Sequence, residues 1–362
     1  MKSRQVFLSL LKSGLWNSAV SDLHNFPLTD VQWQDIYIKS LNHTVEGLIY
    51  LGVTNLPSEF MPPRAILLPW IARVSKIEQR HAWMNDRVSE QLSFFRSHGL
   101  DPFLLKGQGV GRCYENPELR LAGDIDWCFP NKNDYDKAKK VLTESGLDVE
   151  ATAGYSSQTI WSGAEVELHQ RMIDIHNPFK DRFVKNLINA QEPIKFTADN
   201  QQIDWKLPSP LLTHVSVSIH ILKHLLSYGI GLRQWCDAVR ICYTFSAEIN
   251  GSKLREVYRK LGVLKFINVY HGVLVNYLGL PAEYLPFPYD RHAFTDTLIH
   301  DVWEAGNFGF SLEKHVGAEA KNSGKRKEAK QRIWNSFVKY LPFAPAEALS
   351  FPLVQFYSRF NQ

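Results

Sequence analysis

Apolar residues recur at three- and four-residue spacing over the first hundred residues and again over the last hundred and fifty. Between these two regions, short runs alternate apolar and polar residues. The first spacing is typical of helices with one buried face, and the second of strands. The pattern predicts an α+β fold class, in which a small mixed sheet is embedded between N-terminal and C-terminal helical segments.

Turn residues and caps divide the chain further. A helix of about residues 71–97 ends at His98-Gly99, a normal C-terminal signal, and leads directly into the first strand. The central region predicts strands at 103–105, 125–129 and within 147–169, helices at 108–114 and 134–145, and a hairpin from 194–196 and 203–207. Later helices are predicted at about 210–228, 232–246, 252–262, 264–278 and 290–305. We therefore expect four parts: 1–98 helical, 99–207 an α/β core, 208–316 helical, and 317–362 a basic loop with an apolar tail.

Two acids in the second strand carry the clearest chemical signal. In a strand, Asp124 and Asp126 project to the same face, while Ile125 and Trp127 pack behind them. Neighbouring carboxylates repel each other, and a hard divalent cation such as Mg²⁺ or Mn²⁺ is the natural partner for both. The alternative is a solvated acidic turn after Gly123. The apolar neighbours of Asp126 favour the metal site.

A third acid lies in the alternating run of residues 164–169. Glu165 and Glu167 share one face of that strand, so the register decides which of them reaches the aspartates. We prefer Glu167, which is flanked by Val166 and Leu168. The alternative is that Glu167 is an outward-facing residue at the sheet edge.

Basic residues near these acids suggest anion binding. Lys106 and the amides of residues 107–109 stand at a helix start, where unpaired N–H groups favour phosphate. A solvent-facing lysine in a glycine turn is the alternative. Arg120 either binds a phosphate or pairs with Asp124 or Asp126, and we expect an orienting role.

Histidine and cysteine spacing suggests no other metal. His220 and His224 lie four residues apart on a predicted helix, but no acidic motif adjoins them, so we expect packed histidines rather than a zinc site. The four cysteines form no Cys-x-x-Cys pair, which fits a reducing cytoplasm.

Composition narrows the class of protein. Of the 362 residues, 44% are hydrophobic and 22% are charged, as in ordinary soluble globular proteins. No apolar stretch has the length of a membrane span, and we expect a cytoplasmic protein. The net charge of +4 is too small to indicate a nucleic-acid partner by itself. Basic residues concentrate late in the chain: Lys321, Lys325, Arg326, Lys327, Lys330 and Arg332.

These motifs together resemble the DNA polymerase β-like nucleotidyltransferase superfamily. Lys106-Gly107, Arg120, Gly123-Asp124-Ile125-Asp126 and Val166-Glu167-Leu168-His169 are similar to an uncharacterised bacterial branch written K-G, R-x-x-x-D-x-D and h-[DE]-h-H. The resemblance covers roughly residues 95–245, including the segment around Arg233 and Asp237. The widespread superfamily form has Gly-Ser where this chain has Lys106-Gly107.

The resemblance implies a role for each residue type. Catalytic residues and ligands for two Mg²⁺ or Mn²⁺ ions would be Asp124, Asp126 and Glu167. Nucleotide-binding residues would be Lys106, Gly107, Gln108, Arg120 and Gly123. Residues that face the cleft would be His169, Arg171, Arg233 and Asp237, although a supporting role for His169 and Arg171 and an ion pair between Arg233 and Asp237 are alternatives.

The expected function is transfer of a nucleotidyl group from ATP or another nucleoside triphosphate to a hydroxyl acceptor. The acceptor would be a small molecule, a peptide or a protein. Two alternatives are a catalytically silent nucleotide-binding or regulatory protein, and a helical module that binds RNA or protein through the basic segment. Three retained acids favour the enzyme.

Overall fold

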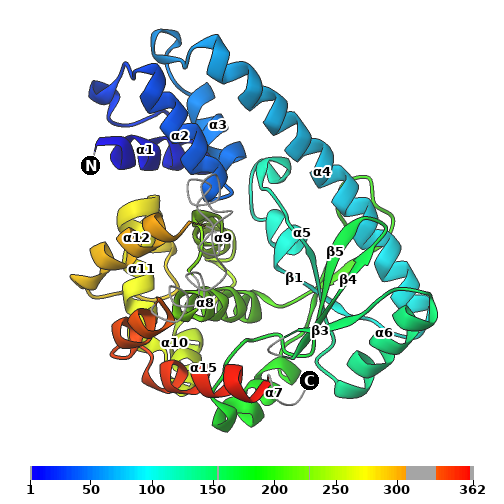
Figure 1. Ribbon diagram of the computed structural model, residues 1–362. Coiled ribbons are helices and arrows are strands. Elements are labelled where there is room, and N and C mark those ends of the chain that lie inside the picture. The colour runs from blue at the N-terminus through cyan, green and yellow to red at the C-terminus, as the bar shows by residue number, and fades with distance from the viewer. Residues whose placement is uncertain (1, 153–154, 228, 307–331, 359–362) are drawn as a thin grey trace, which may run out of the picture.

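The chain runs from helices through strands and back to helices, as the spacing of its apolar residues predicts (Figure 1). A computed structural model describes residues 2–152, 155–227, 229–306 and 332–358. The predicted basic segment of residues 321–332 lies outside the described residues except for Arg332. No helix in the described part of the chain has the length and apolar character that crossing a bilayer requires.

Helices form the first quarter of the chain. They are α1 (Lys2–Trp16), α2 (Asp30–Asn42), α3 (Glu46–Thr54) and α4 (Arg64–Ser97). Thr29 starts α2 with a capping box, because its hydroxyl accepts from the amide of Gln32 while the Gln32 side chain accepts from the amide of Thr29. Helix α4 begins at Arg64 rather than at about residue 71. Pro69, a residue that favours a helix boundary, lies inside the helix near its start and is exposed.

The sheet has five strands in the order β1-β2-β5-β4-β3. These are β1 (Phe103–Leu105), β2 (Ile125–Cys128), β3 (Glu150–Thr152), β4 (Ser156–Trp161) and β5 (Ala164–His169). Strands β2 and β5 are parallel and the other pairs are antiparallel, so the sheet is mixed, as predicted. The connecting helices are α5 (Lys106–Gly111) and α6 (Lys132–Glu144).

The predicted hairpin and the later helices are also present. Strands β6 (Ile194–Phe196) and β7 (Trp205–Leu207) pair antiparallel. The helices after them are α8 (Pro210–Leu226), α9 (Leu232–Thr244), α10 (Gly251–Leu261), α11 (Leu264–Leu278), α12 (Phe294–Ala305) and α15 (Pro345–Ser358). Helix α7 (Asp181–Asn189) was not predicted, although Phe183, Val184, Leu187 and Ile188 have helical spacing. The α+β fold class is confirmed.

Two hydrophobic cores hold these elements. The smaller core joins one face of the sheet to α4 and α6, and it contains Ile125, Trp127 and Phe129. The larger core joins the N-terminal helices to the C-terminal helices and reaches the sheet at Leu105 and Cys128. The sheet therefore lies between α4 on one side and α8 and α9 on the other (Figure 1). The boundaries of the four predicted parts stay a prediction.

The C-terminal helix packs on the segment that follows β5. Glu347 of α15 is 2% exposed and accepts hydrogen bonds from the backbone amides of His176 and Asn177, at 2.7 and 3.0 Å. Phe351 on the same helix is buried in the larger core. The described part of the apolar tail therefore docks on the body.

Close contact between α1 and α3 depends on a glycine. A Cβ atom added at Gly52 would overlap the carbonyl oxygen of Leu10 on α1. We expect Gly52→Ala to lower the free energy of unfolding by about 1–3 kcal/mol, because the two helices would have to separate. Denaturant unfolding measures this change. The matched control is Gly111→Ala, whose added Cβ would meet no atom within 4 Å, and an equal loss in both variants would contradict the prediction.

Candidate active site

The pairing of β2 with β5 brings the predicted acids together. In this parallel pair Asp126 lies opposite Glu167, one residue from each strand. Trp127 points to the other face, where its indole N–H donates to Oε1 of Gln91 on α4 at 2.8 Å. Because side chains alternate along a strand, anchoring Trp127 on one face fixes Asp126 on the other. The prediction that Asp126 and Glu167 share one site is consistent with this register.

Asp126 lies at the centre of the polar cluster. Its side chain is 3% exposed, and its Oδ1 is 3.0 Å from Nζ of Lys106 and 2.7 Å from Nε2 of His169. The same nitrogen of His169 is 3.4 Å from Oε2 of Glu167, whose side chain is 32% exposed. Asp126 is therefore the buried member of the group, and Glu167 is the member that solvent reaches.

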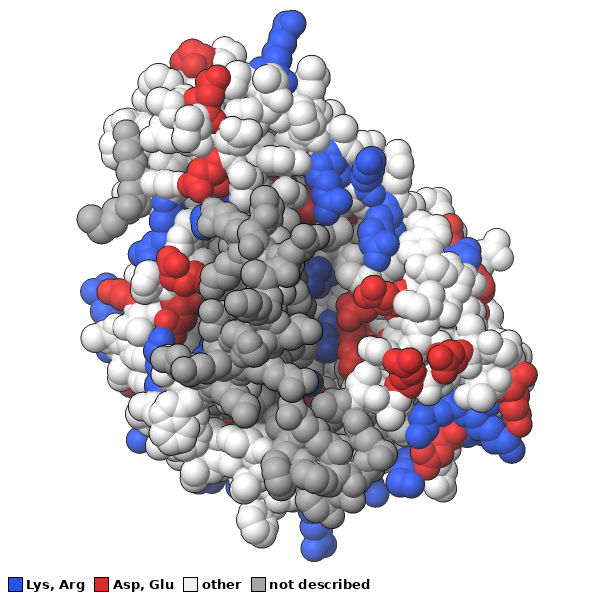
Figure 2. Space-filling view, viewed as in Figure 1, with Lys and Arg blue, Asp and Glu red and all other residues white. Residues whose placement is uncertain are grey.

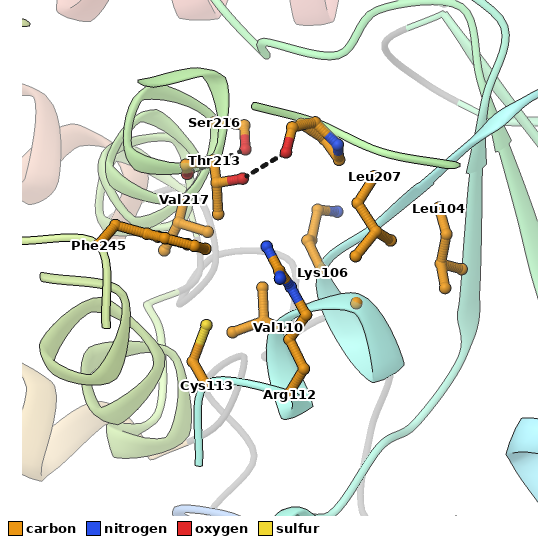
Figure 3. Close-up of a pocket in the computed structure, with 12 residues that line it drawn as sticks. Leu104, Lys106, Val110, Arg112, Cys113, Leu207, Thr213, Ser216, Val217 and Phe245 are labelled. Carbon is orange, nitrogen blue, oxygen red and sulfur yellow. Dashed lines mark hydrogen bonds between the residues drawn. The ribbon is translucent and has the colours of Figure 1, made fainter. Parts of the chain in front are cut away.

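Lys106 reaches Asp126 from a tight turn between β1 and α5. Lys106 and Gly107 have φ angles of 40° and 35°, in the left-handed region that favours glycine. Behind this turn, α5 and α8 line a cavity of only about 10 Å³, with side chains such as Val110, Thr213 and Val217 (Figure 3). This packing keeps the strained turn in place and fixes the lysine beside the acid.

The charges in the cluster depend on one another. Burial alone would raise the pKa of Asp126, but the charge of Lys106 and the hydrogen bond from His169 hold that pKa below its ordinary value. The charge of Asp126, and then burial, raise the pKa of Asp124 to about 6. Burial would lower the pKa of His169, yet the charge of Glu167 and the contact with Asp126 raise it. Of the two aspartates, Asp126 is therefore the more acidic, and Asp124 takes up a proton first as the pH falls.

Three side chains offer atoms that suit a divalent cation. Ligand atoms of Asp126, Glu167 and His169 all lie within 4.8 Å of one another. Two carboxylate oxygens and an imidazole nitrogen form a donor set that Mn²⁺ accepts, and carboxylates also suit Mg²⁺. Asp124, which precedes β2, is outside this group of three. His220 and His224 are not part of any such group among the described residues. The centroids of their rings are 4.4 Å apart, so the two rings pack against each other.

A pocket of about 440 Å³ opens beside the exposed side of the cluster. It is lined by Asp124 and Glu167 and by residues of β3, β4 and β5. Acidic side chains gather over the sheet, and Lys or Arg side chains show in the hollow between the sheet and the helices (Figure 2). A ligand entering here would meet Glu167 and Asp124 before Asp126.

Arg120 pairs with a partner that the sequence did not suggest. Its Nε and Nη2 each donate to a carboxylate oxygen of Asp237 at 2.7 Å, and the hydroxyl of Tyr114 also donates to Asp237. Arg120 therefore does not pair with Asp124 or Asp126. The alternative ion pair between Arg233 and Asp237 is also absent from the described residues, since Nη1 of Arg233 donates to the carbonyl of Leu121 at 2.8 Å.

The other predicted residues lie around this centre. Gln108 is buried against α4, where its amide donates to Asn85. A Cβ atom at Gly107 would lie 3.4 Å from the carbonyl oxygen of Asp124, so the two backbones nearly touch. Arg171 points away from the acids: it pairs with Asp181 at 2.9 Å and lies over the ring of Tyr155. A supporting role fits Arg171 better than contact with a ligand.

Two groups near the site were missed. Asp174 pairs with Lys223 of α8 at 3.0 Å, and it has the same signal as Asp126, an acid between apolar residues, here Ile173 and Ile175. Arg80 of α4 donates to the carbonyl oxygens of Ala122 and Gly123. No local pattern marks Arg80, because its partners lie more than forty residues away.

Removing one partner of the buried Arg120–Asp237 pair should be costly. We expect Asp237→Asn to lower the free energy of unfolding by about 3–5 kcal/mol, because it leaves a buried guanidinium without a charge partner. Denaturant unfolding gives the value. The control Asp181→Asn breaks the more exposed pair with Arg171 and is expected to change stability much less. Equal losses in the two variants would contradict this expectation.

Comparison with known proteins identifies the family to which the chain is similar. The model of a family described as uncharacterised nucleotidyltransferases matches residues 29–278, well over half of the chain. No curated protein matches. A solved structure that matches is an antigenic nucleotidyltransferase-like protein from Paracoccidioides brasiliensis, at 15% identity and a TM-score of 0.34, over 54% of this chain and 92% of that one. The resemblance to nucleotidyltransferases noted in the sequence is confirmed. The chain belongs to this family of uncharacterised nucleotidyltransferases.

Proposed function

We propose that this protein transfers a nucleoside monophosphate group from a nucleoside triphosphate to a hydroxyl group of an acceptor. The observation that carries the proposal is the parallel pairing of β2 with β5, which sets Asp126 opposite Glu167 at the edge of a pocket. Asp124 lines the same pocket. Carboxylates gathered from two strands beside an open pocket are what metal-assisted phosphoryl chemistry requires.

Asp124, Asp126 and Glu167 would hold Mg²⁺ or Mn²⁺. The group of Asp126, Glu167 and His169 supports one ion, and Asp124 would complete a pair of ions together with Asp126. Bound there, the metal would neutralise charge on the phosphate oxygens. The cation already beside Asp126 is the Lys106 ammonium, which offsets carboxylate charge when the metal is away.

Glu167 is the residue best placed to meet the acceptor. It is the more exposed acid of the pair and lines the pocket. We propose that Glu167 accepts the proton of the acceptor's hydroxyl group as a general base. The acceptor oxygen then forms a bond to the α-phosphorus, the bond from that phosphorus to the bridging oxygen breaks, and pyrophosphate leaves. The backbone at Gly107 and Gly123, on either side of Asp124, would position the donor.

The site is compatible with several chemical classes of acceptor. A small molecule, a peptide and a protein side chain would all use the same carboxylates. The pocket beside Glu167 and Asp124 is also lined by Asp148, Glu150 and Glu165, and no Lys or Arg of the described residues lines it. Whatever the acceptor, its hydroxyl has to reach Glu167 across an acidic surface.

A second candidate is a nucleotide-binding protein without transfer activity. It is favoured by the contacts of Asp126, which already accepts from both Lys106 and His169 through one oxygen. A carboxylate compensated in this way binds a metal less strongly, because the metal has to compete with two cationic partners. Turnover separates the two candidates.

We expect Asp124→Asn combined with Asp126→Asn to abolish Mg²⁺-dependent binding of nucleoside triphosphates and to lower transfer by about a thousandfold or more. The assay follows pyrophosphate release from each of the four nucleoside triphosphates, with cell extract as the source of acceptor and with or without Mn²⁺. Transfer by the double variant at the parent's rate would place the site elsewhere. Binding without turnover in the parent would favour the silent protein.

The two acids of β5 provide a matched comparison. We expect Glu167→Gln to reduce transfer far more than Glu165→Gln, because Glu167 lies opposite Asp126 whereas Glu165 is exposed and outside the ligand group. The same assay measures both variants. A larger effect at Glu165 would show that the register of the site differs from that of the sheet.

The raised pKa of Asp124 predicts a pH-dependent metal affinity. Its pKa is about 6 in the folded protein and 3.8 ordinarily, so below pH 6 metal binding has to displace its proton. We expect the affinity for Mn²⁺ to fall by up to about tenfold per pH unit between pH 6 and pH 4.5, and Asp124→Asn to remove that part of the slope. Electron paramagnetic resonance of free Mn²⁺ measures the affinity. Equal slopes in parent and variant would contradict the assignment.

A further inference from the structure

Two arginines from opposite sides hold the loop that precedes Asp124. Nη1 of Arg233, on α9, donates to the carbonyl oxygen of Leu121 at 2.8 Å. Nε and Nη2 of Arg80, on α4, donate to the next two carbonyl oxygens, those of Ala122 at 3.1 Å and Gly123 at 2.6 Å. Consecutive Cα atoms are about 3.8 Å apart, so both guanidinium groups lie within a short distance of the backbone of Asp124.

Neither guanidinium has an acidic partner among the described residues. The other arginines of α4 for which partners are described pair with carboxylates: Arg73 with Glu46, Arg87 with Glu90, and Arg96 with Asp101. Arg80 instead bonds to carbonyl oxygens, which accept hydrogen bonds but carry no net charge. The side chain of Arg80 is half-buried, so part of it faces solvent.

Arg233 has no acidic partner among the described residues because the nearest carboxylate on its helix is taken by another arginine. Asp237 lies one helical turn further along α9, and both of its carboxylate oxygens accept hydrogen bonds from the guanidinium group of Arg120. Nε of Arg233 is buried and has no hydrogen-bond acceptor. Burial, and then the like charge of Arg120, lower the pKa of Arg233. Arg120 thus takes the nearby carboxylate, and the positive charge of Arg233 has no acidic partner among the described residues.

We propose that Arg80 and Arg233 form the phosphate-binding part of the donor site and contact the β- and γ-phosphates of the nucleoside triphosphate. This inference rests on the proposed function. The acids at Asp124, Asp126 and Glu167 would then serve the α-phosphate, and the two guanidinium groups the phosphates that leave. Guanidinium forks match phosphate oxygens in charge and geometry, and each arginine has N–H groups beyond those used on the loop.

The arrangement explains why Lys106 is a weaker candidate for this task. Its ammonium group is 3.0 Å from Asp126, and its positive charge is already matched by that acid. Arg80 and Arg233 are fixed to the loop without losing their charge. Phosphate binding at these residues would also bear on Asp124, since the loop they hold ends at that residue.

Inorganic tripolyphosphate with Mg²⁺ is a direct probe, because it carries the phosphates without a base or an acceptor. We expect Arg80→Gln and Arg233→Gln each to weaken its binding by about ten- to a hundredfold, as measured by calorimetry. The control Arg87→Gln lies on the same helix, but its arginine is already paired with Glu90, and it is expected to bind tripolyphosphate as the parent does. Mn²⁺ binding at the acids should be unchanged in all three variants.

Each outcome decides one question. Parent-like tripolyphosphate binding in both variants would overturn the inference while leaving the proposed function standing, provided that the parent releases pyrophosphate from a nucleoside triphosphate. Loss of Mn²⁺ together with tripolyphosphate would also overturn it, because the arginines would then merely hold the loop. A parent that binds neither tripolyphosphate nor any nucleoside triphosphate would sink both proposals. If a glutamine variant fails to fold, Arg80→Lys and Arg233→Lys keep the charge and are expected to show a smaller but measurable loss.

Discussion

The parallel contact between β2 and β5 is the constraint on which the site depends. It sets Asp126 opposite Glu167, with ligand oxygens within 4.8 Å of each other, and two carboxylates this close repel each other. The sheet tolerates this because Lys106 and His169 both reach Asp126. Each of these partners is itself fixed, Lys106 by a strained turn and His169 by its place at the end of β5. The cluster is thus built into the order of the strands.

Helix α4 turns that local arrangement into a rigid one. Its apolar side chains pack on the face of the sheet opposite the acids, and Gln91 accepts from the indole of Trp127. A shift of β2 by one residue would move Asp126 into this apolar core and Trp127 into the polar cluster. Because both moves would leave unsatisfied groups, the packing of α4 selects the register that places the acids correctly.

Short-range pattern was enough to predict most elements and it singled out the acids, but it did not predict the contacts between distant segments. Alternation predicted β2 and the face of Asp126, whereas the preference for Glu167 over Glu165 rested on the apolar neighbours Val166 and Leu168. The same pattern, an acid between apolar residues, is present at Asp174, which was not predicted. By contrast, the partners of Arg120 and Lys106 depend on how α9 and α5 pack, and Asp237 lies 117 residues from Arg120. Nothing within a few residues of Arg80 distinguishes it from the paired arginines of the same helix.

The distribution of charge between the layers explains why a ligand would bind between them. Asp124, Asp126 and Glu167 all come from the strands β2 and β5 or the loop before β2, while Arg80 and Arg233 come from the helices α4 and α9. A metal-bound triphosphate presents cationic and anionic surfaces at once, so it can satisfy the sheet and the helices together. The loop of residues 121–123 is the one described segment that touches both arginines and leads into the acids. Under the proposed function, binding of phosphate at the arginines is therefore expected to affect metal binding at the acids.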